Sequence, residues 1–240
     1  MFMNNKLTKL ITTLVQILNL YGGNKMSKIK ACIFDLDGVV VDTAKYHYLA
    51  WRRLANELGF EFTETDNERL KGVSRMDSLN ILLEIGGKSF DAAEKDRLAA
   101  RKNAWYVEYI TKMEESEILP GVKDFMKLLK KEGIKISLGS VSKNAMTILN
   151  GINLTEYFDA IIDGNKVKNA KPDPEVFLNA AKELNVSPQQ CVVFEDATAG
   201  IEGAIRANMF SVGIGSPEIL NKANKVIPGF VGVDLSILDF

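Results

Sequence analysis

The chain has 240 residues, of which 46% are hydrophobic and 25% are charged, and its formal net charge is −1. These values are ordinary for a globular protein with one large core, or with a core and a smaller inserted domain. The near-neutral charge excludes the basic footprint of a typical nucleic-acid-binding protein. Both cysteines, Cys32 and Cys191, lie in apolar runs. We therefore expect buried thiols without a disulfide framework, and a reducing cytoplasm as the location.

The first 28 residues form an N-terminal extension that differs in character from the rest. Its apolar stretch, 7–20, is too short to cross a bilayer as a helix, and no small-residue cleavage site follows it. We expect translation to start at Met26, which would make residues 1–25 an artefact of the assigned start. The alternative is an amphipathic helix that docks on a partner or on a membrane surface.

The first part of the remaining chain predicts one strand followed only by helices. An apolar run at 29–34 predicts the strand. Apolar residues at helical spacing, with many Ala, Leu, Lys and Glu residues between them, predict three helices. These helices are predicted at 43–58, 74–83 and 91–114. The stretch ends at the turn signal Pro120-Gly121, so we expect a helical insert directly after the first strand.

After Gly121 the pattern changes to alternating helices and strands. Strands are predicted at 134–138, 160–162, 191–194 and 210–214. Helices are predicted at 122–132, 174–184 and 200–207, and Ser142 is expected to cap a further helix after the second strand. Strands that alternate with helices of this length predict a parallel sheet with right-handed crossovers. The predicted fold class is α/β, with a core at 29–42 and 117–240 and an all-helical cap at 43–116.

Two carboxylates, Asp35 and Asp37, directly follow the first predicted strand and lead into Gly38. Ligands of open parallel sheets bind beyond the carboxyl ends of the strands. Residues two apart on an extended chain point the same way, and two like charges that close need a cation or a shared proton. This pair therefore predicts a hard divalent cation with oxygen ligands, namely Mg²⁺.

Three further polar motifs follow later predicted strands. The run from Gly139 to Asn144 offers hydroxyl groups at a helix start, which suits a phosphate. Lys171, held in a proline-flanked loop, can neutralise phosphoryl charge, and the adjacent acids Glu195 and Asp196 suit Mg²⁺. Each motif alone has a plainer interpretation, as a helix cap, a turn or a solvated acidic pair. Their order along the chain, each at a strand end, favours a single site.

Together the four motifs resemble those of the haloacid dehalogenase (HAD) superfamily of phosphatases and phosphomutases. The resemblance implies a HAD-like Rossmannoid parallel-sheet core with an inserted all-helical cap domain. It also implies that Asp35 is a nucleophile that forms an aspartyl-phosphate, and that Asp37 is the general acid and base. The residues implied to hold the transferring phosphoryl group are Ser140 and Lys171. The implied Mg²⁺ ligands are Asp35, Asp37 through its backbone carbonyl, Glu195 and Asp196.

Within this superfamily the chain resembles the β-phosphoglucomutase family from about Lys30 to Ile227. The residues that carry this resemblance are His47, Trp51, Leu70 to Arg75, Ser78, Arg101-Lys102-Asn103 and Ser142-Lys143-Asn144. The resemblance implies that substrate is bound by Trp51, Lys71, Gly72, Val73, Arg75, Ser78, Lys102, Ser142, Lys143 and Asn144. Of these, Arg75 and 142–144 would hold the second, non-transferring phosphate, while Lys71 and Ser78 would contact the sugar. Thr43, His47 and Lys102 would link cap closure to the position of Asp37. A lone histidine is more often structural, but the matching Thr43, Tyr46 and Lys71 around His47 favour a functional role.

The function implied by this resemblance is Mg²⁺-dependent interconversion of β-D-glucose 1-phosphate and β-D-glucose 6-phosphate. Glucose 1,6-bisphosphate would be the activating intermediate, and sugar phosphates the only partners of a cytoplasmic monomer that binds neither nucleic acid nor membrane. A mutase moves two phosphates past one nucleophile, so it needs a second anion anchor, which a guanidinium such as Arg75 suits. The main alternative is a HAD sugar-phosphate phosphatase with the same core and cap. A catalytically inactive HAD binding module is a third possibility, disfavoured because Asp35 and Asp37 are both present.

Overall fold

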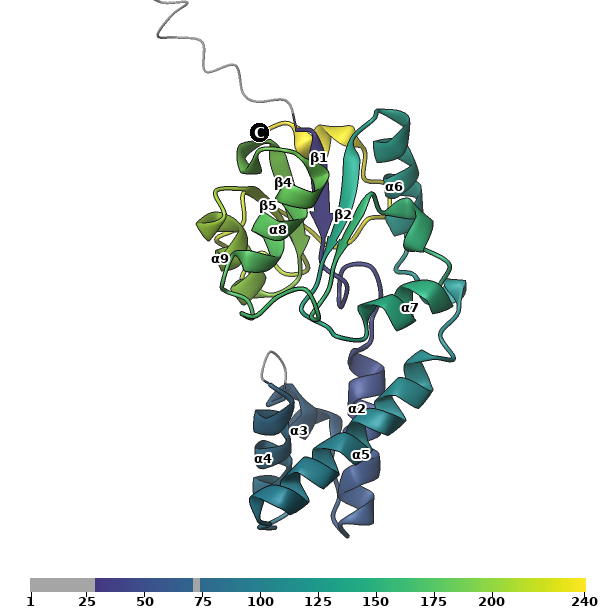
Figure 1. Ribbon diagram of the computed structural model, residues 1–240, viewed down its shortest axis with the longest axis vertical. Helices are drawn as coiled ribbons and strands as arrows, with labels where there is room; N and C mark the ends of the chain where they lie inside the picture. The colour runs from purple at the N-terminus through teal and green to yellow at the C-terminus, as the bar shows by residue number, and fades with distance from the viewer. Residues whose placement is uncertain (1–28, 71–73) are drawn as a thin grey trace, which may run out of the picture.

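The structure, a computed structural model, has an α/β core and a smaller helical part on one side of it (Figure 1). It describes residues 29–70 and 74–240. The predicted N-terminal extension and the predicted substrate-binding residues Lys71, Gly72 and Val73 lie outside the described residues. Among the helices of the described residues, none combines the length and apolar character needed to cross a membrane.

Six strands form one parallel sheet in the order β3-β2-β1-β4-β5-β6. The strands are β1 (Ala31–Phe34), β2 (Lys135–Gly139), β3 (Ala160–Ile162), β4 (Cys191–Glu195), β5 (Phe210–Ile214) and β6 (Lys225–Ile227). The chain adds β2 and β3 on one side of β1, then returns to add β4, β5 and β6 on the other. The strand order therefore switches between β1 and β4, and such a switch opens a crevice at the carboxyl ends of the strands.

Side chains of the central strands alternate between two apolar layers, as the pleat of a strand requires. Cys32 and Phe34 of β1 pack with α6 (Val122–Lys131) and α7 (Ala145–Gly151) on one face of the sheet. Ala31 and Ile33 pack on the other face. That face is covered by α8 (Glu175–Leu184) and α9 (Thr198–Arg206). Because both faces are covered, β1 can be apolar along its whole length, and β4 from Cys191 to Phe194.

Four phenylalanine rings fix β1 and β4 to the layer above them. Phe34 stacks on Phe194 with 4.8 Å between ring centroids. Phe125 of α6 meets Phe194 edge-on at 5.5 Å, and Phe230 of the C-terminal segment lies 5.6 Å from Phe125. Aromatic clusters of this kind bury a large area and hold specific geometries. The two strand ends that carry Asp35 and Glu195 are therefore set by a rigid part of the core.

Between β1 and α6 the described residues form helices, without a further strand. The main helices are α2 (Ala44–Glu57), α3 (Glu64–Glu68), α4 (Arg75–Ile85) and α5 (Ala92–Ile110). We call this helical part the cap. It has its own apolar interior, in which Trp51, Leu79, Leu82 and Leu98 are buried together.

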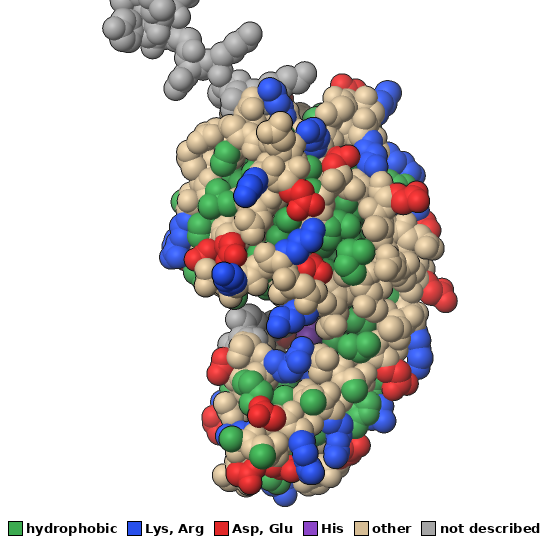
Figure 2. All heavy atoms as spheres, in the orientation of Figure 1, with side chains coloured by type: hydrophobic (Ala, Val, Ile, Leu, Met, Phe, Trp, Pro, Cys, Tyr) green, Lys and Arg blue, Asp and Glu red, His purple; other side chains and the backbone are tan. Residues whose placement is uncertain are grey.

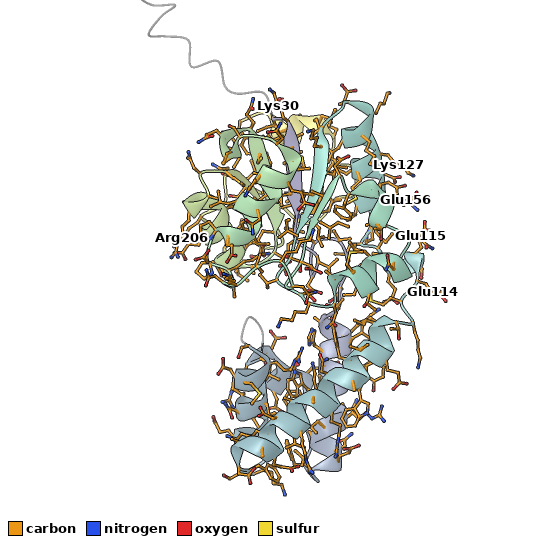
Figure 3. The ribbon with its side chains drawn as sticks, in the orientation of Figure 1. Lys30, Glu114, Glu115, Lys127, Glu156 and Arg206 are labelled. Atoms are coloured by element: carbon orange, nitrogen blue, oxygen red, sulfur yellow. The ribbon has the colours of Figure 1, made fainter. Side chains whose placement is uncertain are left out.

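Two linkers join the cap to the core, and they are tied to each other. Val41 pairs with Ile118 in an isolated bridge, and the Leu119 amide donates to the Val40 carbonyl at 2.9 Å. The Tyr46 hydroxyl of α2 donates to Glu117 at 2.5 Å. The second linker carries Glu114 and Glu115 on the outer edge of the molecule (Figure 3). These contacts make the linkers one joint between the two parts.

The predicted α/β fold class is confirmed, and the strands at 160–162 and 210–214 have the bounds that the sequence indicated. The prediction that Ser142 caps the next helix is wrong, because α7 begins at Ala145 with Asn144 as its N-cap residue. The helix predicted to Glu114 ends at Ile110. Two short elements, α3 and β6, were not predicted. Five helical residues at α3 and three strand residues at β6 are too few to show a hydrophobic period.

The aromatic cluster gives a stability prediction. Phe125→Ala removes a ring that is 1% exposed, and it should lower the free energy of unfolding by about 3–5 kcal/mol. The matched control on the same helix is Leu128→Ala, because Leu128 is 37% exposed. Chemical denaturation of both variants measures the difference, and equal losses of stability would contradict this account of the cluster.

Candidate active site

Three carboxylates meet at the switch point of the sheet. In the register of β1 and β4, Phe34 is the partner of Phe194, so the next residues, Asp35 and Glu195, lie side by side. Asp196 follows, and one oxygen from each of the three carboxylates lies within 4.8 Å of the others. Asp35 is 7% exposed and Glu195 is 1% exposed. Two of the three charges are therefore largely removed from water.

Lys171 provides the positive charge beside this cluster. Its Nζ lies 2.5 Å from Asp35 Oδ1 and 2.8 Å from Glu195 Oε2. Burial alone would lower the pKa of Lys171, but the two carboxylates hold it above its ordinary value. One ammonium faces three carboxylates, so an excess of negative charge remains.

That excess shows in the pKa values of the acids. Burial, and then the charge of Asp35, raise the pKa of Asp196 to about 6. Burial also raises the pKa of Glu195, although Lys171 opposes this shift. Acids whose ionised forms are held close together and out of water favour a hard cation. The donor set of Asp35, Glu195 and Asp196 therefore fits Mg²⁺.

Two glycines let the backbone approach the acids closely. A Cβ at Gly200 would lie 2.0 Å from the carboxyl carbon of Glu195, and one at Gly38 would lie 2.0 Å from Asp196 Oδ2. Gly38 also has a φ of +76°, a backbone angle that residues with a side chain rarely adopt. Gly200 was not predicted as a site residue. A glycine within the first turn of a helix, just after a pair of acids, is the signal that could have indicated it.

Asp37 does not belong to the three-carboxylate cluster and has a different partner. Thr43, the N-cap residue of α2, makes no capping hydrogen bond. Its hydroxyl instead donates to Asp37 Oδ1. Burial, and then the charge of Asp35, raise the pKa of Asp37 to about 7, while the bond from Thr43 opposes that rise. A carboxyl with a pKa near neutrality is suited to both giving and accepting a proton.

The residues after β2 form a compact hydroxyl-rich loop beside the acids. Ser140 is buried, and its Oγ accepts the Ser142 amide at 3.1 Å. The Ser142 hydroxyl accepts the Asn144 amide at 3.3 Å. The Gly164 amide donates to the Ser142 carbonyl at 3.0 Å, and Asn165 Nδ2 donates to the Lys143 carbonyl at 3.2 Å. These hydrogen bonds hold the loop in place, some through its own side chains and others through the residues that follow β3.

The cap contributes a buried lysine–histidine pair. Lys102 of α5 is 2% exposed, and its Nζ lies 2.9 Å from His47 Nδ1 and 4.5 Å from the ring centroid of Trp51. While Lys102 is protonated its ammonium only donates, and Nδ1 of His47 then accepts this hydrogen bond. Burial, then the charges of Lys102 and Arg75, lower the pKa of His47 to about 3. Burial, then Arg75, lower the pKa of Lys102 to about 7. Trp51 packs beneath Lys102 inside the cap.

Arg75 is the first residue of α4 and is exposed, while Ser78, one turn later, is buried. The charge of Arg75 lowers the pKa values of His47 and Lys102, so Arg75 lies close to this pair. Lys and Arg side chains gather on both sides of the notch between cap and core (Figure 2). The cap therefore presents positive charge toward the acidic end of the sheet.

A further residue beside this pair, Tyr106, was not predicted. It lies one turn after Lys102 on α5, and its ring stacks on His47 with 4.1 Å between centroids. The spacing of four residues from Lys102 places both on one face of the helix. That spacing is the sequence signal that could have indicated it.

Four features together resemble the haloacid dehalogenase class: a buried acid directly after β1, a lysine in a loop beside it, an acidic pair at the end of β4, and an inserted helical cap. Residues 29–208 match the family model described as haloacid dehalogenase-like hydrolase. The chain belongs to this family.

Within the family, the chain is similar to β-phosphoglucomutases. It is 43% identical over 212 residues to the β-phosphoglucomutase of Bacillus subtilis, covering 88% of this chain and 94% of that protein. The crystal structure of β-phosphoglucomutase from Clostridium difficile matches with a TM-score of 0.78 and 48% identity, over 88% of this chain and 96% of that one. A phosphorylated carbohydrates phosphatase of Thermotoga maritima is 37% identical over 187 residues, covering 75% of this chain and 82% of that protein.

The bond between Thr43 and Asp37 gives a prediction about acidity. Thr43→Val removes a hydrogen bond that lowers the pKa of Asp37, so that pKa should rise above about 7. A ¹³C NMR titration of protein labelled at its aspartate carboxyls measures the shift, with Asp37→Asn assigning the signal. Thr155→Val is the control. The Thr155 hydroxyl donates to the exposed Asn150, and neither residue is near Asp37 in the sequence. A pKa that falls or stays unchanged in Thr43→Val would contradict the geometry.

Proposed function

We propose that this protein is a Mg²⁺-dependent β-phosphoglucomutase that interconverts β-D-glucose 1-phosphate and β-D-glucose 6-phosphate. The observation that carries the proposal is the cluster of Asp35, Glu195 and Asp196 beside Lys171. The cap that faces it carries the two positive charges of Arg75 and Lys102 near each other. A sugar bisphosphate carries negative charge at both ends. One end would be complemented by the positive charge of the cap, and the other by Lys171 together with a Mg²⁺ that offsets the excess negative charge of the acids. The similarity to β-phosphoglucomutases supports the choice of sugar.

Asp35 is the proposed nucleophile. In one half of the cycle the substrate is glucose 1,6-bisphosphate. A carboxylate oxygen of Asp35 attacks the phosphorus at C1, so an Asp35 O–P bond forms as the sugar O–P bond breaks, and Asp37 gives its proton to the departing sugar oxygen, which releases glucose 6-phosphate. In the other half, β-glucose 1-phosphate meets phospho-Asp35: Asp37 takes the proton of the C6 hydroxyl as its oxygen attacks phosphorus, and the Asp35 O–P bond breaks to regenerate glucose 1,6-bisphosphate. Ser140 and Lys171 hold the phosphoryl oxygens during transfer.

The proposed Mg²⁺ ligands are the side chains of Asp35, Glu195 and Asp196 and the backbone carbonyl of Asp37. When bound, Mg²⁺ neutralises negative charge on the phosphoryl group and its acidic surroundings. The raised pKa values of Glu195 and Asp196 support this assignment, because they report negative charge without enough compensation.

The second phosphate is proposed to bind between the cap and the loop after β2. Its proposed ligands are Arg75, Ser142, Lys143 and Asn144. Lys71 and Ser78 are proposed to contact the sugar, with Gly72, Val73, Trp51 and Lys102 completing the substrate site on the cap. Residues 43–116 would move as the cap, and Thr43, His47 and Lys102 would couple that movement to Asp37. We further propose that the enzyme acts as a cytoplasmic monomer.

A sugar-phosphate phosphatase is the second candidate function. The similarity to the Thermotoga maritima phosphatase favours it, and its chemistry would use the same acids. The two functions differ in the acceptor of the phosphoryl group, which is a sugar hydroxyl in a mutase and water in a phosphatase.

One assay separates the two functions. Purified protein is supplied with Mg²⁺, β-glucose 1-phosphate and a trace of glucose 1,6-bisphosphate, and both glucose 6-phosphate and inorganic phosphate are measured. We expect glucose 6-phosphate as the main product. Inorganic phosphate as the main product would replace the mutase with the phosphatase, and the absence of both products would contradict both functions.

Replacing the nucleophile gives a prediction for the same assay. Asp35→Asn should abolish turnover while leaving the fold intact, because no neighbouring group can form the acyl phosphate in its place. The circular dichroism spectrum and melting temperature serve as the control for folding. Turnover within about tenfold of wild type would refute the nucleophile assignment.

Replacing the proposed anchor separates mutase from phosphatase chemistry. A charge-assisted contact contributes about 1.5–3 kcal/mol, so Arg75→Ala should lower mutase turnover about tenfold or more. Hydrolysis of acetyl phosphate, which has no second phosphate, should barely change. Arg97→Ala is the matched control, because Arg97 is a cap arginine whose side chain is 70% exposed and pairs with Glu94. If both activities of Arg75→Ala fall equally, Arg75 is structural.

A further inference from the structure

Lys171 has a buried side chain but is carried by an exposed segment of the chain. Its side chain is 9% exposed and its ammonium contacts Asp35 and Glu195, whereas the three residues before it, 168–170, are exposed. A group that holds a reacting phosphoryl group has to be in the same place in each turnover, because small displacements cost rate. The contacts that anchor this segment are therefore part of how the site is built.

Glu175, the first residue of α8, closes the segment into a loop. Its Oε2 accepts the amide of Asn169 at 2.9 Å, and both of its carboxylate oxygens lie 3.2 Å from the amide nitrogen of Lys168. The amide of Asn169, and then that of Lys168, hold the pKa of Glu175 below its ordinary value. Lys171 lies between the two bonded ends, so the carboxylate of Glu175 holds the base of the loop that carries it.

A turn inside this loop fixes the backbone around Lys171. The Asp173 amide donates to the Ala170 carbonyl at 3.0 Å, and Asp173 Oδ1 accepts the amide of Glu175 at 2.9 Å. The turn shapes the tip of the loop, while the carboxylate of Glu175 joins the start of the loop to α8.

The helix that carries Glu175 is itself firmly placed in the core. Phe177, two residues later, is fully buried, and its ring centroid lies 5.1 Å from Lys171 Nζ, within the range of a cation–π contact. A Cβ on Gly139 or Gly203 would lie 3.2 or 3.1 Å from a carbon of this ring, so the ring fits closely between the end of β2 and α9. The loop and the ammonium of Lys171 are thus both held against the same helix.

An acidic residue in the first turn of a helix has a plainer explanation. Its charge is favourable near the amino end of the helix dipole, and a capping carboxylate bonds amides of its own helix. The carboxylate of Glu175 instead bonds two amides outside α8, six and seven residues earlier in the chain. The dipole does not account for these partners.

We propose that Glu175 is a positioning residue that sets the place of Lys171 by holding the base of its loop. In this role Glu175 acts on the reaction through the Lys171 ammonium, and not by contact with the substrate. This inference rests on the proposed role of Lys171 in holding the transferring phosphoryl group.

Two variants of similar side-chain length separate hydrogen bonding from charge. Glu175→Gln keeps an oxygen that accepts and loses the charge, whereas Glu175→Met loses both. We expect kcat to fall about tenfold in Glu175→Met, as for lost hydrogen bonds to a charged group. In Glu175→Gln it should fall only about threefold, because neutral hydrogen bonds are about half as strong. The matched control is Glu183→Gln on the same helix, whose carboxylate lies 3.6 Å from Lys166 and which should leave kcat unchanged.

A second measurement follows the Lys171 ammonium itself. Ammonium groups that are buried and hydrogen-bonded exchange protons slowly enough to appear in ¹H–¹⁵N NMR spectra at low temperature, and Lys171→Arg identifies the signal by its loss. We expect this signal to be unchanged in Glu175→Gln and shifted or broadened in Glu175→Met. Melting temperatures of all variants are recorded, and Glu175→Ala takes the place of Glu175→Met if that variant does not fold.

Three results would overturn the inference. Equal losses of kcat in Glu175→Gln and Glu175→Met would mean that Glu175 acts by charge alone. A Lys171 signal that is unchanged in Glu175→Met would mean that Glu175 does not act through Lys171. A lower melting temperature in Glu175→Met with kcat and the signal both unchanged would mean that its role is purely structural.

The two measurements separate this inference from the proposed function. Product analysis of the wild type decides between mutase and phosphatase, and kcat is then compared for whichever activity is found, because Lys171 serves the phosphoryl group in both. A wild type with neither activity would overturn the proposed function. The ammonium signal needs no activity, so it would still decide whether Glu175 sets the place of Lys171.

Discussion

Three carboxylates held within 4.8 Å of one another, with one buried lysine beside them, are the constraint on which the rest of this structure depends. Such an arrangement is unfavourable by itself, because burial and like charge both oppose ionisation. The fold maintains it through the register of β1 and β4, through the aromatic cluster between those strands and α6, and through two glycines that leave room for the acids. The fold itself therefore holds the three acids together, so their arrangement does not depend on a bound cation.

The cap complements this charge from the other side of the notch. Lys102 is buried beside His47 and Trp51. Arg75 is close enough to lower the pKa values of His47 and Lys102. The cap has an apolar interior of its own, so it can keep this arrangement while its position changes. The two linkers are joined at Val41 and Ile118, close to Thr43 and Asp37. A movement of the cap would thus act near Asp37, the proposed general acid and base.

The sequence was sufficient for the parallel sheet and for the acids, because both depend on strong local signals. The apolar run before Asp35 and the apolar run before Glu195 each predicted a strand end, and parallel strands bring such ends together. Weaker signals were not sufficient. Ser142 has the chemistry of an N-cap, but its hydroxyl bonds the Asn144 amide and the helix begins later. Gly200 and Tyr106 matter because of what lies across from them in space. Their local signals, an early helix glycine and a spacing of four residues, place them on their helices but do not show that they face the carboxylate of Glu195 and the ring of His47.

The most direct test of the central claim is a calorimetric titration of the protein with Mg²⁺ near pH 7, in two buffers of different ionisation enthalpy. The raised pKa values of Glu195 and Asp196 mean that these acids are partly protonated without metal, so Mg²⁺ should bind and release protons. Glu195→Gln should bind about tenfold more weakly or worse. The control Glu202→Gln, which removes only an exposed pair with Arg206, should bind as wild type does. The absence of Mg²⁺ binding, or equal affinity in Glu195→Gln, would contradict the account.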